Sequence, residues 1–285
     1  MSTHGRTRNQ RCVRWALSAI LLCVIAYCVG ELWAKTAPYR QEAALRQEMQ
    51  AYKPEVTQAL PQEVTPPAAD APAAASTAPT PAATAPAVDA PAFAVPNQRI
   101  LDLQSRNRDA LGWLDIADTQ IDYPFVQATD NERYLATDFD GQPAAAGTLF
   151  LDWRSRTDFQ GFNHVIYGHA MKNGSMFGTL RKFADQAHFD AHPTGRIHLV
   201  IATYQLEIFA YLIVDAKDTM IYATHNTEPE SRADFFDYVK TRAHHYRNIG
   251  LNPIDRIVTL STCTYETETA RIVLLARLSP IEKGD

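Results

Sequence analysis

The sequence predicts a mainly β domain, a closed barrel of eight strands, which follows a membrane anchor and a linker. From residue 112 onward, short stretches rich in Ile, Val, Tyr and Phe alternate with turn residues, a pattern typical of strands. A set of eight strands can close into a barrel and leave no unpaired edge. The second observation is an apolar run near the N-terminus that is long enough to cross a bilayer. The predicted strands are residues 112–116, 121–126, 147–151, 164–167, 196–202, 206–214, 256–262 and 271–278.

Helical patterns accompany these strands. They cover residues 97–111, 175–184 and 231–247. The last is inserted before the seventh predicted strand and has Ser231 in the N-cap position. We expect His244 and His245 on its solvated face. Its apolar side consists of Phe235, Phe236, Val239 and Tyr246.

The apolar run at residues 15–34 is the predicted transmembrane anchor. Trp15 and Trp33 stand at its two ends, where interfacial aromatic residues are common. Basic residues gather before it, and only Lys35 closely follows it. The positive-inside bias therefore predicts that residues 1–14 are cytoplasmic and that the rest of the chain lies outside the cell membrane. The alternative is a cleaved signal peptide, but no clear cleavage site follows the run.

Residues 35–96 are predicted to be a stalk and linker. Residues 36–53 are polar and helical in composition. Residues 54–96 hold ten of the seventeen prolines and too little apolar bulk for a core, so they predict a semi-rigid spacer. The catalytic domain is then residues 97–285, and we expect a chain that begins near Asn97 to fold by itself.

The net charge and the cysteine count exclude some classes of function. The formal net charge of −5 argues against a nucleic-acid-binding domain, which would be basic. Three of the four cysteines lie in or beside the apolar run, so Cys263 is the one cysteine of the domain. A single cysteine forms no internal disulfide, and no CxxC pair is present, so we expect neither a metal nor another cofactor.

Cys263 stands at the end of the predicted strand 256–262, and Arg271 begins the next strand. If these strands pair as an antiparallel hairpin, the two residues face one another at its mouth. A guanidinium there could hold a substrate carbonyl oxygen or an oxyanion, and it would favour the thiolate over the thiol. The pattern therefore predicts a nucleophilic cysteine.

A thiol nucleophile needs a base, and nine histidines are available. His169 follows the predicted strand 164–167 and Gly168, so it too stands at a strand end, where active sites collect. Position alone leaves this assignment weak. Asp152 and Asp255 are possible orienting acids near strand ends.

Several segments resemble sortases, the cysteine transpeptidases of Gram-positive bacteria. Residues 259–263 (TLSTC), followed by Arg271, resemble the family signature. Residues 163–169 (NHVIYGH) and 171–177 (MKNGSMF) resemble the class B form in particular. The helical insertion before the cysteine strand is similar to the extra helix of that class. Residues 114–116, 121–124 and 150–153 also look like class B segments, and the resemblance covers residues 97–279.

The resemblance implies a sortase-type eight-stranded barrel with His169, Cys263 and Arg271 at one end of a groove. In that family the cysteine attacks the Thr carbonyl of a C-terminal sorting signal and forms a thioacyl enzyme. An amine resolves it, either a lipid-linked cell-wall precursor or a pilin lysine. Thr264 departs from relatives that carry an acid after the cysteine. The positions matching substrate-binding residues are Asn131, Leu135, Met220, Ile221, Tyr222 and Ser261.

The residues alone leave other functions open. A membrane-tethered cysteine peptidase would use the same Cys263 and His169 with water as acceptor. A non-catalytic barrel that binds peptides would need neither. Against the latter stands the coincidence of a cysteine, a histidine and an arginine at predicted strand ends.

Overall fold

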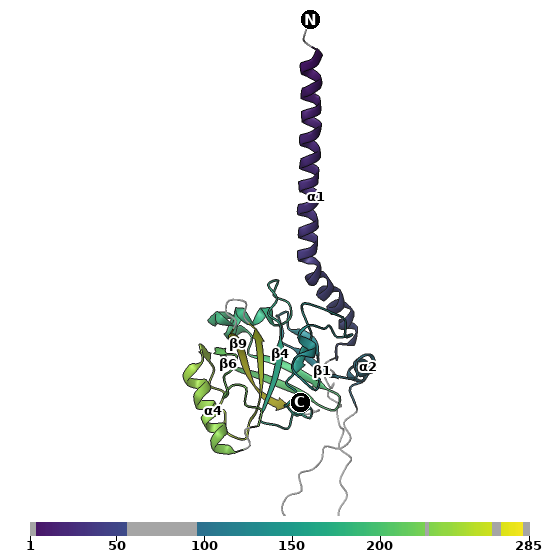
Figure 1. Ribbon diagram of the computed structural model, residues 1–285. Helices are drawn as coiled ribbons and strands as arrows, with labels where there is room; N and C mark the ends of the chain where they lie inside the picture. Colours follow the sequence, from purple (N-terminus) through teal and green to yellow (C-terminus); the bar gives the residue numbers. More distant parts are fainter. Residues whose placement is uncertain (1–3, 56–95, 226–227, 264–268, 282–285) are drawn as a thin grey trace, which may run out of the picture.

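A computed structural model describes residues 4–55, 96–225, 228–263 and 269–281 (Figure 1). Eight strands close into a barrel in the order β5-β1-β2-β3-β4-β8-β9-β6, because β5 also pairs with β6. The eight predicted strands all form, and the closed barrel is confirmed. They are β1 (Ala110–Asp115), β2 (Asp122–Val126), β3 (Leu149–Leu151), β4 (Asn163–Gly168), β5 (Thr194–Leu199), β6 (Thr203–Asp215), β8 (Arg256–Cys263) and β9 (Ala270–Pro280).

The barrel is mixed. β2 pairs with β3, and β4 pairs with β8, in parallel, whereas its other pairings are antiparallel. A parallel pair needs a long crossover connection. Between β4 and β8 the chain therefore builds β5, β6 and the helices that flank them before it returns. As a result, the C-terminal ends of β4 and β8 lie at the same end of the barrel.

Strand alternation divides the apolar residues between the barrel interior and its outer faces. Ile166, Leu260 and Leu274, on the adjacent strands β4, β8 and β9, are buried in the interior cluster. Val273 and Leu275 belong to a second cluster under α4 (Pro229–Arg242). A third cluster lies under α2 (Gln98–Arg106) and the end of α1 (His4–Met49). The strands are therefore covered on both faces over much of their length.

Helix α4 differs at both ends from its prediction. It begins at Pro229, with Glu228 rather than Ser231 at the N-cap, because proline fits the first helical position. It stops at Arg242, since the next residues form the short strand β7 (His245–Tyr246) on β6. The expectation that His244 and His245 lie on this helix is therefore wrong. Unpaired backbone groups at the β6 edge bind this segment instead.

Of the other two predicted helices, the first ends at Arg106 rather than at residue 111, because β1 already begins at Ala110, and the second differs in type. Helix α2 is capped by Asn97, whose side chain accepts a hydrogen bond from the Arg99 amide at 3.1 Å. The stretch predicted at 175–184 forms a 3-10 helix, η3 (Phe177–Ala184), and α3 (Gln186–Ala191) follows it. A short 3-10 turn, η2 (Arg133–Leu135), lies between β2 and β3.

Helix α1 runs without a break from the apolar segment into the barrel, and η1 (Gln50–Tyr52) follows it. Its apolar residues are exposed, and the described part of the chain contains one helix long and apolar enough to span a membrane. The helix contains Pro38 and bends near the barrel (Figure 1). Beyond it, Glu42 and Met49 are buried against the barrel. Residues 36–53 are thus helical as predicted, but their end packs on the domain.

Candidate active site

The strand register brings the three predicted catalytic positions to one end of the barrel. β4 and β8 run parallel with Gly168 beside Thr262, so the next residues, His169 and Cys263, follow at the same end. β8 and β9 are antiparallel with Cys263 directly opposite Arg271. Three adjacent strands therefore deliver a histidine, a cysteine and an arginine to one edge.

The half-buried His169 ring is held from behind by a backbone carbonyl. Its Nε2 lies 2.7 Å from the carbonyl oxygen of Leu135, at the end of η2. That contact orients the ring if Nε2 carries the proton, and it leaves Nδ1 as the basic nitrogen. The Phe177 amide donates to the His169 carbonyl at 2.9 Å, which fixes the backbone at the same place.

Close packing behind His169 explains one glycine. A Cβ at Gly147 would lie 2.5 Å from the Tyr134 carbonyl, 2.8 Å from that of Leu135 and 3.2 Å from the His169 ring. Its φ of +60° also favours glycine. The loop before β3 can thus approach the histidine closely.

Arg271 is half-buried at the start of β9. Its Nη1 donates to the Ala270 carbonyl at 3.1 Å. On the neighbouring strand Arg271 pairs with Val214, so this residue lies on the strand between the cysteine strand β8 and the end of β6. This location suits the predicted role in binding a carbonyl oxygen. Thr264 lies outside the described residues.

Asn131 is fixed by the acid that follows β3. Its amide nitrogen donates to Asp152 Oδ2 at 3.1 Å, and its carbonyl oxygen accepts from the Trp153 amide at 3.0 Å. Asp152 is fully buried and also paired with Arg154 at 2.8 Å. Burial alone would raise its pKa, but the hydrogen bonds from Arg154 and Asn131 outweigh it and hold the pKa below its usual value. Asp152 therefore stays ionised and orients Asn131.

Two tyrosines connect this acid to the cysteine strand. Tyr167 donates to Asp152 Oδ2 at 3.1 Å and stacks on Tyr222, with ring centroids 6.1 Å apart. The Tyr222 hydroxyl lies 2.9 Å from the hydroxyl of Ser261. Burial, with the nearby charge of Asp152, raises the pKa of Tyr167, so it remains a neutral donor. These contacts link Asn131 to Ser261, whose own side chain is buried at 1% exposure.

The other predicted groove residues differ in exposure. Leu135 is 37% exposed, so its side chain is accessible to a ligand. Met220 is half-buried and lines an open hollow at the end of β6. Ile221, however, is fully buried in the cluster under α4, and its backbone carbonyl accepts from Asn163 at 2.9 Å. Its side chain packs in the core and does not face the groove.

Sequence reasoning missed Tyr167 and gave Asp152 only as a possible orienting acid. In the structure Asp152 binds Asn131 and Tyr167. Asp255 accepts from the Asn252 amide and lies 3.8 Å from Arg277, beyond the start of β8 and away from Cys263. A signal for Tyr167 was its place two residues before His169, because alternate strand residues share a face.

A family model for the Sortase domain matches residues 114–279. Sortase B of Listeria monocytogenes is 42% identical over 182 residues, which cover 62% of this chain and 72% of the relative. The structure of a Staphylococcus aureus sortase B–substrate complex is similar with a TM-score of 0.62 and 27% identity, over 66% of this chain and 87% of that one. A Bacillus anthracis protein described as similar to sortase B aligns with a TM-score of 0.60 and 32% identity, over 66% and 85% of the two chains.

Proposed function

Because this chain belongs to the sortase family and is a cysteine transpeptidase of class B, we propose that Cys263 forms a thioacyl intermediate with a C-terminal sorting signal. The observation that carries the proposal is the register of β4, β8 and β9, which places His169, Cys263 and Arg271 at one end of the barrel. The signal is the Thr-containing segment that similar enzymes cleave.

The reaction then has two steps. The Cys263 thiolate attacks the Thr carbonyl carbon, the C–N bond breaks, and His169 gives its proton to the leaving amine. The acceptor amine next attacks the thioester, and His169 takes up the proton that this amine loses. The C–S bond breaks and returns Cys263 as thiolate. The new amide joins the protein to a lipid-linked cell-wall precursor or to a pilin lysine.

We assign Arg271 to the carbonyl oxygen. This oxygen carries negative charge in each tetrahedral intermediate, and a fixed guanidinium beside Cys263 would stabilise it. The same charge favours the thiolate form of the cysteine. Arg271 thus acts in both steps without exchanging a proton.

The signal peptide is proposed to lie against a wall formed by Asn131, Leu135 and Tyr222, with the buried Ser261 bonded to the Tyr222 hydroxyl. Asn131 offers an oriented amide, and Leu135 offers exposed apolar surface for a hydrophobic side chain. Met220 would extend this wall, while Ile221 supports it from the core.

We further propose that α1 anchors the enzyme in the cell membrane, with residues 1–14 in the cytoplasm and the barrel outside. This topology rests on the arginines before the apolar run and on the exposed apolar surface of the helix. It would place the barrel where secreted proteins emerge and lipid-linked precursors are present.

The test uses the full chain in detergent micelles and a library of peptides with Thr at a fixed position, with and without hydroxylamine. Mass spectrometry should detect an acyl adduct on Cys263 and, with hydroxylamine, a hydroxamate of the N-terminal fragment. The Cys263→Ala variant should form neither. Release of the free acid at an unchanged rate, with no hydroxamate, would indicate a peptidase. Cleavage by Cys263→Ala would exclude the cysteine mechanism.

A further inference from the structure

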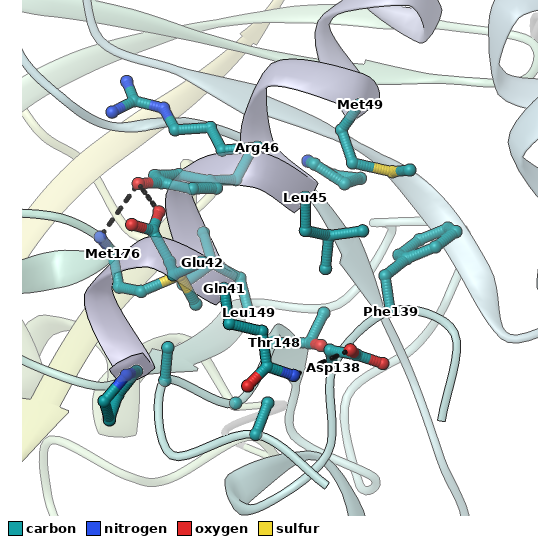
Figure 2. A pocket seen from close by; sticks show the side chains of 16 residues that line it. Gln41, Glu42, Leu45, Arg46, Met49, Asp138, Phe139, Thr148, Leu149 and Met176 are labelled. Atoms are coloured by element: carbon teal, nitrogen blue, oxygen red, sulfur yellow. Dashed lines mark hydrogen bonds between the residues drawn. The ribbon is translucent and has the colours of Figure 1, made fainter. Parts of the chain in front are cut away.

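The end of α1 lies behind the loops that hold His169. Figure 2 shows the pocket between this helix and the barrel, into which Glu42, Leu45 and Met49 point from α1. Across it lies Met176, which belongs to the loop that follows His169. The helix therefore contacts the catalytic end of the barrel.

A chain of hydrogen bonds crosses this pocket. The Tyr123 hydroxyl donates to Glu42 Oε1 at 2.8 Å and accepts from the Met176 amide at 3.0 Å (Figure 2). Glu42 is 8% exposed and Tyr123 is 5% exposed, so water competes little for these groups. Burial, followed by the charge of Glu42, raises the pKa of Tyr123, which keeps its hydroxyl a donor.

The chain ends at the backbone of His169. Ala170 and Met176 form an antiparallel bridge, and the amide of Phe177, the next residue, donates to the His169 carbonyl. Met176 has a φ of +52°, a conformation that needs support from its surroundings because its side chain disfavours it. The bond from the Met176 amide to Tyr123 supplies such support at this residue.

Helix α1 also contacts the loop before β3, on the other side of His169. The Gln41 amide donates to the Pro143 carbonyl at 3.2 Å, on the segment that leads to Gly147. Gly147 packs against the Leu135 carbonyl, which contacts His169 Nε2. Both sides of the histidine thus depend on contacts with α1.

We infer that Gln41 and Glu42 of α1 are a working part of the active site, in which Glu42 and Tyr123 position His169. The inference rests on the proposed function, in which His169 is the acid and base. It assigns a catalytic contribution to a segment whose composition predicts only a stalk. Positioning matters because displacement of a catalytic group by about 1 Å can reduce a rate by about a hundredfold.

The test measures alkylation of Cys263 by iodoacetamide as a function of pH, in the full chain in micelles, with mass spectrometry of the Cys263 peptide. This readout needs no peptide substrate and reports how His169 affects the thiolate. His169→Ala should change the pH profile. Tyr123→Phe and Glu42→Leu should change it in the same direction and lower the alkylation rate at neutral pH by about tenfold.

Matched variants separate positioning from stability. Glu42→Gln keeps an acceptor for the Tyr123 hydroxyl and should restore most of the wild-type profile. Glu48→Gln removes an exposed carboxylate of the same helix, which pairs with Arg106, and should change nothing. Glu42→Leu leaves the buried Tyr123 hydroxyl without its acceptor, so the alkylation profiles are compared at a temperature where every variant is folded, and the melting temperature of each is measured beside its profile. The double variant of Glu42→Leu and Tyr123→Phe should lose no more than either single variant, because the two act in one chain.

The outcomes are distinct. If His169→Ala changes the profile while Tyr123→Phe and Glu42→Leu keep that of the wild type, the positioning role of α1 is excluded and the proposed function stands. If His169→Ala itself leaves the profile unchanged, His169 does not act on Cys263. The proposed function then fails, and this inference fails with it.

Discussion

Cys263 and Arg271 occupy directly opposite positions on the antiparallel strands β8 and β9. Opposite residues in such a pair have Cβ atoms about 5 Å apart, which is within reach of a long guanidinium side chain. This pairing would let the Arg271 side chain reach the oxygen of the carbonyl group that Cys263 is proposed to attack.

Arg271→Ala should therefore lower kcat/KM by about 10²–10³, the usual effect of removing one oxyanion donor. Arg271→Lys should recover only part, because the charge returns without the planar fork of donors. Steady-state kinetics on a sorting-signal peptide would measure both.

Arg277 is the matched control for this prediction. It lies on the same strand but binds Glu207, away from the hairpin mouth. Arg277→Ala should lower the melting temperature and leave kcat/KM nearly unchanged at a temperature where it is folded. Equal kinetics for wild type and Arg271→Ala would remove Arg271 from the catalytic set.

Leu135 should bind substrate and contribute little to stability, because its side chain is 37% exposed. Leu135→Ala should raise KM about tenfold, since loss of about 1.4 kcal/mol of apolar contact corresponds to that factor. Its melting temperature should not change. Tyr134→Ala, at a neighbouring buried position, should lower the melting temperature and leave KM nearly unchanged at a temperature where the variant is folded. A drop in stability with Leu135→Ala as large as its loss of activity would place Leu135 in the core.

The barrel was predictable because its strands are short, apolar and separated by turn residues. β7 was not, since two residues carry no period, and helical propensity continues through that segment. Only the unpaired edge of β6 decides its conformation. The packing of α1 on the barrel could not be predicted from the sequence either. Residues 36–53 look polar, and 44 residues separate Lys53 from Gln98, so the contact depends on tertiary structure.

At the site, strand ends were the useful signal. The end of β8 and the start of β9 place Cys263 and Arg271 from sequence alone. His169 required the family resemblance, because nothing local distinguishes it from other histidines. Asp152 was ambiguous, since its partner Asn131 lies 21 residues away and its hydrogen bond depends on the path of the intervening loop.

His164 should make stability depend on pH. It is fully buried, stacks on Phe159 and lies with Nε2 3.0 Å from the Gly161 carbonyl. Burial lowers the pKa of His164 to about 4. The unfolded chain, with an ordinary histidine pKa of about 6.5, then binds more protons than the folded one between these values. The free energy of unfolding should therefore decrease as the pH is lowered through this window, by up to about 3 kcal/mol from this residue.

Urea titrations at pH values from 7 to 4 would measure this slope. His164→Leu cannot ionise and should flatten the dependence, although it loses the hydrogen bond to Gly161. His225 is exposed, so His225→Leu should leave the slope as in the wild type. An unchanged slope in His164→Leu would show that other groups cause the loss at low pH.

Residues 36–53 should stabilise the catalytic domain. Met49 is 2% exposed in the third cluster, and Lys53 pairs with Asp122 at 2.9 Å. Burial of one such methionine contributes about 1.5–3 kcal/mol. A chain that begins at Thr36 should therefore melt several degrees higher than one that begins at Glu55, which keeps the linker but lacks the helix. A chain that begins at Asn97 should have the same melting temperature as the chain that begins at Glu55, because both lack the helix.

A synthetic peptide of residues 36–53, added to the chain that begins at Glu55, should restore the melting temperature in a concentration-dependent way, because a ligand that binds only the folded state stabilises it. Identical melting temperatures for the chains that begin at Thr36 and Glu55, with no effect of the peptide, would mean that residues 36–53 do not stabilise the barrel.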